Sequence, residues 1–389
     1  MNTCCLQHRQ LFCWMGLQLQ FVTILIVLFF CTRYNALQMI LLQYKGAVAM
    51  FLFGRHMTKR EFFERFADVS QVGGIRSYTL NDGRAKGIDA LEVNTGAGLR
   101  FTVLKDRGLD IGWADYKSTP IGFISKAGIS SSLHFEHKMA ELHRVFGPGL
   151  LTTCGLRNIG GACVVDGEEF AQHGRIHNAP AENVSAIGYW NGDEYKMVIK
   201  GELREANLFG ESLRLIRKIE TTLGSNTFKL TDTVVNLSLR EEDICILYHI
   251  NFGYPLVDEG ASIVLPSAQI LHDTSKEHTG LWTNEIARLD EPRVNAGRAY
   301  FMGMDDEDVK VGIHNDKLES MKGIYLRYKK SQLPSFTIWR NLTPGDYVVG
   351  LEPGTANPEG RKQLLDKGQM VKLAPMEERQ FEIEFGMEV

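Results

Sequence analysis

The chain has 389 residues, of which 44% are hydrophobic and 23% are charged, a composition typical of a globular protein with room for one large domain or two. Residues 61–389 contain all 47 acidic residues and 37 of the 43 basic ones, which gives this part a formal net charge of −10. An acidic surface repels nucleic-acid phosphates, so this composition argues against a nucleic-acid partner.

Residues 1–49 differ from the rest of the chain, and "FVTILIVLFFC" (21–31) is an apolar run of signal-sequence length. Extended to 11–31, this run gives only a marginal membrane anchor, because a spanning helix needs roughly 20 apolar residues. The alternative is an extension from an upstream start codon, since Met50 and Met57 each precede a sensible start of the domain. We favour this second interpretation and expect one domain over residues 50–389.

The number and spacing of the cysteines indicate a cellular compartment. Four of the seven lie in the first 31 residues, and only Cys154, Cys163 and Cys245 follow, without the paired spacing of a metal site. This usage indicates a reducing compartment without a disulfide framework. We therefore expect a cytoplasmic protein, with membrane anchoring or secretion as the alternative if the N-terminal apolar run is a genuine signal.

The domain is predicted to begin with a short helix and to continue as strands. "TKRE" (58–61) has the form of a capping box before an apolar helix face. Period-two alternation then dominates, and hairpin turns separate the runs, which predicts an all-β protein built as a large antiparallel β-sandwich. The predicted strands are 99–104, 195–203, 213–223, 228–237, 244–252, 323–329, 335–342 and 381–387. Residues 129–146 and 267–298 lack alternation and are predicted to be long excursions with helical turns.

One candidate catalytic residue, His249, lies in the predicted strand "ICILYHINF" (244–252). Alternation places His249 on the face of Asn251, opposite the face of Tyr248. A histidine in mid-strand is often a satisfied side chain of a half-buried sheet. The functional interpretation is a general acid, because imidazole changes its charge near neutral pH.

Glu352 is the second candidate, at the end of the run "YVVGLE" and before the irregular turn "PGTANP". Gly350 lies on the same strand face and leaves space beside the carboxylate. Taken alone, Glu352 would more often be a solvated side chain. Together with His249, it would supply a base and an acid to one pocket without a metal or a cofactor.

A third cluster, "TTCGLRNIGG" (152–161) and "QHGRIHN" (172–178), embeds donor side chains among glycines. Several hydrogen-bond donors with little hydrocarbon suit a ligand rich in hydroxyl groups. The alternative is a polar loop whose arginines are solvated or paired. The candidate binding residues of this cluster are Arg157, Asn158, His173 and Arg175.

Three further histidines raise the question of a metal, because His134 and His137 could share a helical face near Glu141, with His143 following. Their spacing matches no specific metal signature. We favour a polar surface helix here and expect no metal or other cofactor.

In chain order, these clusters resemble the aldose 1-epimerase, or galactose mutarotase-like, superfamily, and most of all its bacterial-type branch. The resemblance spans about residue 50 to the C-terminus and rests on five short segments. These are "GLRN", "DGEEFAQHGRIHN", "YHINFGYPL", "LEPGTANP" and "LAPMEERQFEIEF". It implies a single-domain β-supersandwich with a sugar site on one open face.

The resemblance also implies roles for individual residues. His249 matches the histidine that protonates the ring oxygen, and Glu352 matches the carboxylate that removes the anomeric hydroxyl proton. His173 matches a sugar-contacting histidine. Arg157 resembles the arginine of the family's Asn-Arg motif, although the order here is Arg-Asn and the interval to His173 is shorter.

The implied function is that of an isomerase that interconverts the anomers of a free sugar. Two alternatives stay open from the sequence. One is a sugar-binding module without catalysis, because a shared fold does not establish turnover. The other is a sugar-phosphate epimerase, which would require clustered Arg or Lys at the pocket mouth. The sequence predicts no oligomeric state.

Overall fold

The computed structural model describes residues 50–389, so the predictions for the first 49 residues lie outside the described part. The chain begins with the hairpin of β1 (Met50–Leu52) and β2 (Arg55–Met57), followed by α2 (Lys59–Phe63). The predicted capping box is confirmed: the Thr58 hydroxyl accepts from the Glu61 amide, and the Glu61 carboxylate accepts from the Thr58 amide. Among these residues, no helix is long and apolar enough to cross a membrane.

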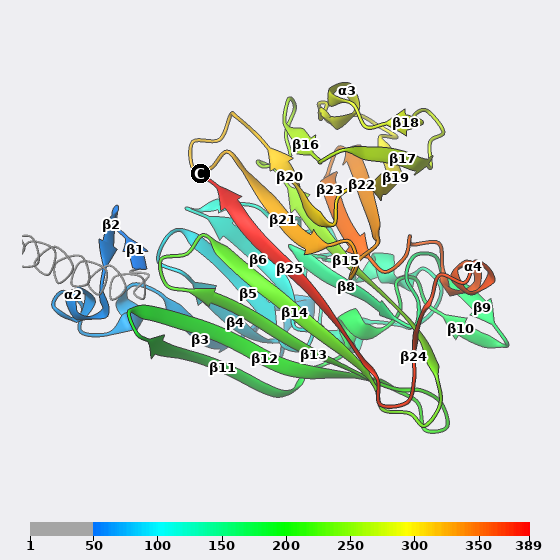
Figure 1. Cartoon of the computed structure of the whole chain (residues 1–389), viewed down its shortest axis with the longest axis horizontal. Coiled ribbons are helices and arrows are strands. Elements are labelled where there is room, and N and C mark those ends of the chain that lie inside the picture. The colour runs from blue at the N-terminus through cyan, green and yellow to red at the C-terminus, as the bar shows by residue number, and fades with distance from the viewer. Residues whose placement is uncertain (1–49) are drawn as a thin grey trace, which may run out of the picture.

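Three antiparallel sheets form the body of the molecule (Figure 1). A five-stranded sheet contains β3 (Gly74–Thr79), β4 (Asp89–Asn94), β5 (Leu99–Leu104), β6 (Asp110–Tyr116) and β7 (Thr119–Pro120). The β13 sheet has the order β11 (Glu182–Asn191), β12 (Glu194–Ala206), β13 (Ser212–Thr222), β14 (Thr227–Asn236), β25 (Glu378–Glu388), β21 (Gly323–Lys329), β20 (Asp308–His314) and β16 (Ser262–Val264).

The third sheet, the β15 sheet, has the order β18 (Gly280–Leu281), β17 (Ala268–Asp273), β19 (Gly297–Met304), β22 (Ser335–Thr343), β23 (Asp346–Gly354), β15 (Glu242–Gly253) and β24 (Val371–Leu373), with β8 (Leu151–Leu156) also paired to β15. Smaller elements are the hairpin of β9 (Cys163–Val165) and β10 (Glu168–Phe170), and α4 (Arg361–Asp366). One large hydrophobic core collects buried side chains from all three sheets.

The predicted all-β, antiparallel sandwich is confirmed, and all eight predicted strands are present. In β13 and β14 every second side chain is buried, which is the alternation that made these strands predictable. Strand β15 differs, because almost all of its residues are buried. It is covered on both faces, so the face that carries His249 is also enclosed by protein.

The two predicted excursions are only partly as expected. Residues 129–146 contain two short 3₁₀ helices, η3 (Ser132–His134) and η4 (Glu141–Arg144), so the polar surface helix predicted for the histidines is wrong. Residues 267–298 contain the short helix α3 (Asn284–Ala287), as expected, but also β17 and β18. These strands are short and pair at the edge of a sheet, which leaves little alternation in the sequence to reveal them.

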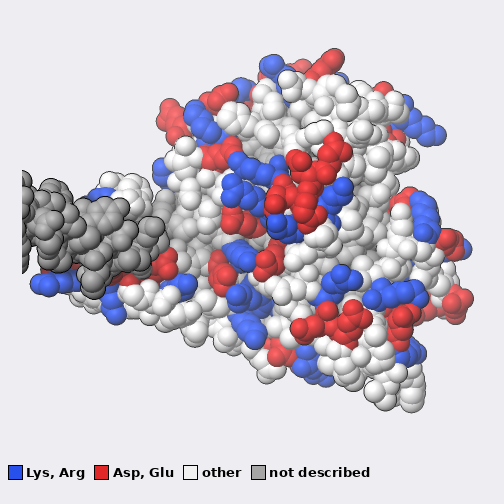
Figure 2. All heavy atoms as spheres, viewed as in Figure 1, with Lys and Arg blue, Asp and Glu red and all other residues white. Residues whose placement is uncertain are grey.

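Acidic and basic side chains are interspersed on the outward face of the β13 sheet (Figure 2). Cross-strand pairs such as Lys229–Glu382, at 2.9 Å, and Arg327–Glu384, at 3.5 Å, link neighbouring strands. Exposed pairs of this kind contribute little to stability. This face is therefore a mixed-charge surface without a concentrated patch of one sign.

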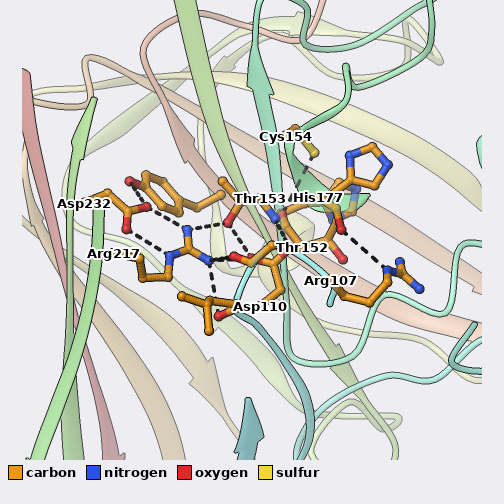
Figure 3. A network of polar contacts seen from close by, with 12 residues as sticks. Arg107, Asp110, Thr152, Thr153, Cys154, His177, Arg217 and Asp232 are labelled. Carbon is orange, nitrogen blue, oxygen red and sulfur yellow. Dashed lines mark hydrogen bonds and ion pairs between the residues drawn. The ribbon is translucent and has the colours of Figure 1, made fainter. Parts of the chain in front are cut away.

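A buried polar network joins the β13 sheet to the β15 sheet (Figure 3). Arg217 of β13 is 0% exposed and lies 2.6 Å from Asp110 of β6 and 2.6 Å from Asp232 of β14. The same guanidinium donates to the hydroxyl of Thr153 in β8, and the hydroxyl of Tyr248 in β15 donates to Asp232. One guanidinium thus contacts two buried carboxyl groups, burial raises the pKa of one of them, Asp110, and the network connects five strands.

Removing this cation is expected to be costly. Arg217→Met leaves Asp110 and Asp232 buried without a counter-ion, so the free energy of unfolding should fall by about 3–5 kcal/mol in chemical denaturation. Arg214→Met is the matched control, because Arg214 lies on the same strand in a partly exposed pair with Glu202 and should cost about 1 kcal/mol or less. Equal losses in both variants would contradict the role of the network.

Candidate active site

The strand register places His249 and Glu352 side by side. Strand β15 pairs with β23 through Ile250↔Leu351 and Asn251↔Gly350, which sets His249 opposite Glu352. On the other side of β23, Thr337 of β22 pairs directly with Glu352. Cross-strand partners project to the same face of a sheet. These three side chains therefore form a row across three adjacent strands.

The acid and base candidates are in contact. Nε2 of His249 lies 3.2 Å from Oε1 of Glu352, and the two residues are 5% and 2% exposed. Both line one cavity of about 330 Å³, together with His143, Phe146, Gln172, His173, Thr337 and Trp339. The structure thus brings together the two residues that the sequence suggested, at a hollow of the size of a small ligand.

Gly350 creates the space beside the pair. A Cβ atom at this position would lie 2.7 Å from Oε1 of Glu352 and 3.4 Å from Cε1 of His249. The first distance is too short for ordinary van der Waals contact, so the carboxyl group would have to move. The absence of a side chain at Gly350 therefore lets the carboxyl and the imidazole occupy the same enclosed corner.

Aromatic rings surround the imidazole. The ring centroids of Phe146 and Trp339 lie 5.4 and 5.3 Å from that of His249, both in edge-to-face geometry, and His173 lies 5.6 Å away. Rings packed in this way restrict the rotation of the imidazole and offer apolar surface to a ligand. The wall of the cavity around His249 is thus aromatic.

Burial controls the ionisation of the pair. It raises the pKa of Glu352 to about 8 and lowers the pKa of His249 to about 3, the latter with a smaller contribution from the neighbouring His173. Both shifts favour the neutral forms of the two groups. Between these pH values the pair therefore holds a single proton and carries no net charge.

His173 is fixed as a hydrogen-bond donor. The amide of Gly160 donates to Nδ1 of His173 at 3.2 Å, which places the proton of the neutral ring on Nε2. Burial and the nearby His143 lower the pKa of His173 to about 4, so the ring is neutral near pH 7. Its free N–H suits a ligand oxygen in the cavity.

The other sequence candidates lie elsewhere. The guanidinium of Arg157 pairs with Glu168 and lies 3.2 Å from Glu211, outside the lining of this cavity. The Asn158 side chain is buried and binds backbone, since it donates to Ala171 at 2.7 Å and accepts the amide of residue 361 at 2.6 Å. Both side chains are therefore committed to protein partners.

Arg175 is exposed and lines a different cavity, described below. The structure thus separates Arg157, Asn158 and Arg175 from the His249–Glu352 pair. Of the four candidate binding residues of the third cluster, only His173 lines the cavity of that pair.

Several cavity residues were not singled out from the sequence as binding residues. Thr337 and Trp339 are two residues apart on the predicted strand "SFTIWRNL" and therefore lie on one face of it. Pairing of this strand with that of Glu352 could have identified them as residues of the same face. His143, considered above as a metal ligand, lines the cavity instead. Within the described part of the chain, no three His, Cys, Asp or Glu side chains form a group suited to a metal ion.

The fold is that of the galactose mutarotase-like β-sandwich proteins. A "putative aldose 1-epimerase" from Klebsiella pneumoniae has a similar structure, with a TM-score of 0.74 and 22% identity over 80% of this chain and 83% of that one. A galactose mutarotase-like protein from Clostridium acetobutylicum gives a TM-score of 0.57 and 16% identity over 82% of this chain and 99% of that one. At these identities the likeness establishes the fold.

The chain belongs to the family described as "Domain of unknown function (DUF4432)", whose model matches residues 85–387. This family has the galactose mutarotase-like fold. Among curated proteins, no sequence matches the chain significantly.

Adding a methyl group at Gly350 should disturb the pair directly. We expect Gly350→Ala to displace the Glu352 carboxyl and to lower any turnover at this site by about 10²-fold, because a displacement of about 1 Å can cost this much. Gly161→Ala is the matched control: Gly161 also lines the cavity, but its added methyl would meet no atom within 4 Å. Equal turnover in the two variants would contradict this role of Gly350.

Proposed function

We propose that the protein is an aldose 1-epimerase that interconverts the α and β anomers of a free sugar. The single observation that carries this proposal is the buried contact between His249 and Glu352 at the wall of a cavity. An acid and a base in contact suit this reaction, because the two oxygens that exchange protons, O1 and O5, are bonded to the same carbon of the sugar. Both can be reached from one corner.

The reaction follows from the single proton of the pair. When that proton lies on Nε2 of His249, Glu352 is a carboxylate; the two groups lie 3.2 Å apart. Glu352 then takes the proton of O1 while His249 gives its proton to O5, the C1–O5 bond breaks, and the aldehyde forms. Rotation about C1–C2 and the reverse transfers close the ring on the other face. The pair begins and ends each turnover with one proton.

The lining of the cavity supports a free sugar as the ligand. Trp339 and Phe146 offer apolar surface for the C–H faces of a pyranose, and His173 and Gln172 offer polar groups. The hydroxyl of Thr337 is buried without a hydrogen-bond partner among the described residues, which suits a sugar hydroxyl. Of the described residues, no Arg or Lys lines this cavity, which disfavours a sugar phosphate.

Exchange spectroscopy by NMR tests the proposal, because it measures the rate of α/β interconversion of free aldoses. The wild-type protein should accelerate this exchange for at least one aldose. Glu352→Gln should lower the catalysed rate by about 10²–10⁴-fold, since the amide cannot accept the O1 proton, and should still bind the sugar. Glu384→Gln, on the outward face of the β13 sheet, is the control and should keep full activity.

Two results would overturn the proposal. Full activity in Glu352→Gln would remove the carboxylate from the mechanism. Binding of aldoses by the wild-type protein without any acceleration of their exchange would identify a sugar-binding module.

The pH profile provides a separate test. Below about pH 8 the pair holds its proton, and above this value Glu352 loses it and leaves no acid for O5. We expect kcat/KM to be level near neutral pH, to fall as the pH rises through about 8, and to fall again only in strong acid, where His249 gains a second proton. A kcat/KM that rises as the pH increases through 8 would contradict a proton held between His249 and Glu352.

A further inference from the structure

A second cavity, of about 510 Å³, lies behind the segment that carries His173. It is formed by the segment around Arg175 and Asn178, by the end of β12, which carries Glu205, and by the connection from β12 to β13, which carries Glu211. Gln172 and His173 line the first cavity, whereas Arg175 and Asn178 line the second. The same short segment therefore separates two cavities.

The second cavity contains polar atoms without partners. Asn178 is 7% exposed, and neither its amide nitrogen nor its amide oxygen has a hydrogen-bond partner within residues 50–389. A buried carboxamide left unpaired is costly, so such a group calls for a ligand. It offers both donors and acceptors.

Two further groups add unused hydrogen-bonding capacity. Arg175 is exposed at the cavity, and its side chain makes no hydrogen bond or ion pair with the described residues. Glu205 is 6% exposed; its Oε2 accepts from the amide of Leu156 at 2.8 Å, and burial raises its pKa. Glu205 thus lies between a backbone donor and the cavity.

The remaining charges are of both signs and mostly contact one another. Glu168 and Glu211 both lie against the guanidinium of Arg157, and Arg204 pairs with Glu182 at 2.7 Å. The charge of Arg175 is balanced by Glu205 when that carboxyl group is ionised. A cavity of mixed charge with spare donors and acceptors suits a neutral ligand with several hydroxyl groups.

We propose that this cavity binds a neutral polyhydroxylated molecule, a sugar or a polyol, through Arg175, Asn178 and Glu205. Its volume is larger than that of the first cavity, at about 510 Å³ against about 330 Å³, so a molecule of monosaccharide size can enter. The proposal does not depend on catalysis at His249 and Glu352. Sorbitol is a suitable probe, because it has no anomeric carbon and cannot be an epimerase substrate.

Isothermal titration of the full chain with sorbitol tests this site. Arg175→Ala should weaken sorbitol binding by about tenfold or more, because a hydrogen bond from a charged donor is lost. Arg175 is exposed, so this substitution leaves the fold intact. Arg379→Ala, which removes another exposed arginine, on β25, is the matched control and should bind as the wild type does. Asn178→Leu should weaken binding similarly, with its folding checked by thermal unfolding.

Three outcomes would overturn the proposal. The first is no measurable sorbitol binding by the wild-type protein. The second is equal affinity in Arg175→Ala and wild type, which would assign the binding to another place. The third is much tighter binding of gluconate than of sorbitol, which would show an anion site. Because sorbitol cannot be epimerised, these three outcomes can be distinguished even if the protein does not catalyse aldose exchange at the first cavity.

Discussion

The structure depends on one constraint, the burial of an imidazole and a carboxyl group in contact at paired positions of two adjacent strands. Antiparallel pairing directs His249 and Glu352 to the same face, and the missing side chain of Gly350 leaves them room. Burial makes charge costly there, so the pair holds one proton near neutral pH. The proposed chemistry uses that shared proton.

The rigid setting of this pair comes from the opposite face of β15. Tyr248 precedes His249 and points away from it, toward Asp232 and the buried Arg217. Because successive side chains of a strand face opposite sides, an anchor at Tyr248 also fixes the position of His249. The β13 sheet therefore supports the candidate site from behind, although none of its residues lines the first cavity among those described.

Much of the fold could be predicted because strands alternate with a period that is visible locally. The strands with one face in the core, such as β13 and β14, were found from this pattern alone. The strands β17 and β18 were missed, because β18 is an edge strand of two residues and a register shift interrupts the alternation of β17. Residues 129–146 contain two short 3₁₀ helices, and the regular helix predicted for their histidines does not form.

For the site, the sequence by itself determined which strand faces carry His249 and Glu352, because parity along a strand is a local property. Only the tertiary structure decided that these faces meet across β15 and β23, and that Thr337 joins them. It also decided where the side chains of the donor-rich loops lie. Arg157 pairs with Glu168 and Glu211, and Arg175 lines a second cavity. The direction of a loop side chain depends on partners distant in sequence, which no local pattern records.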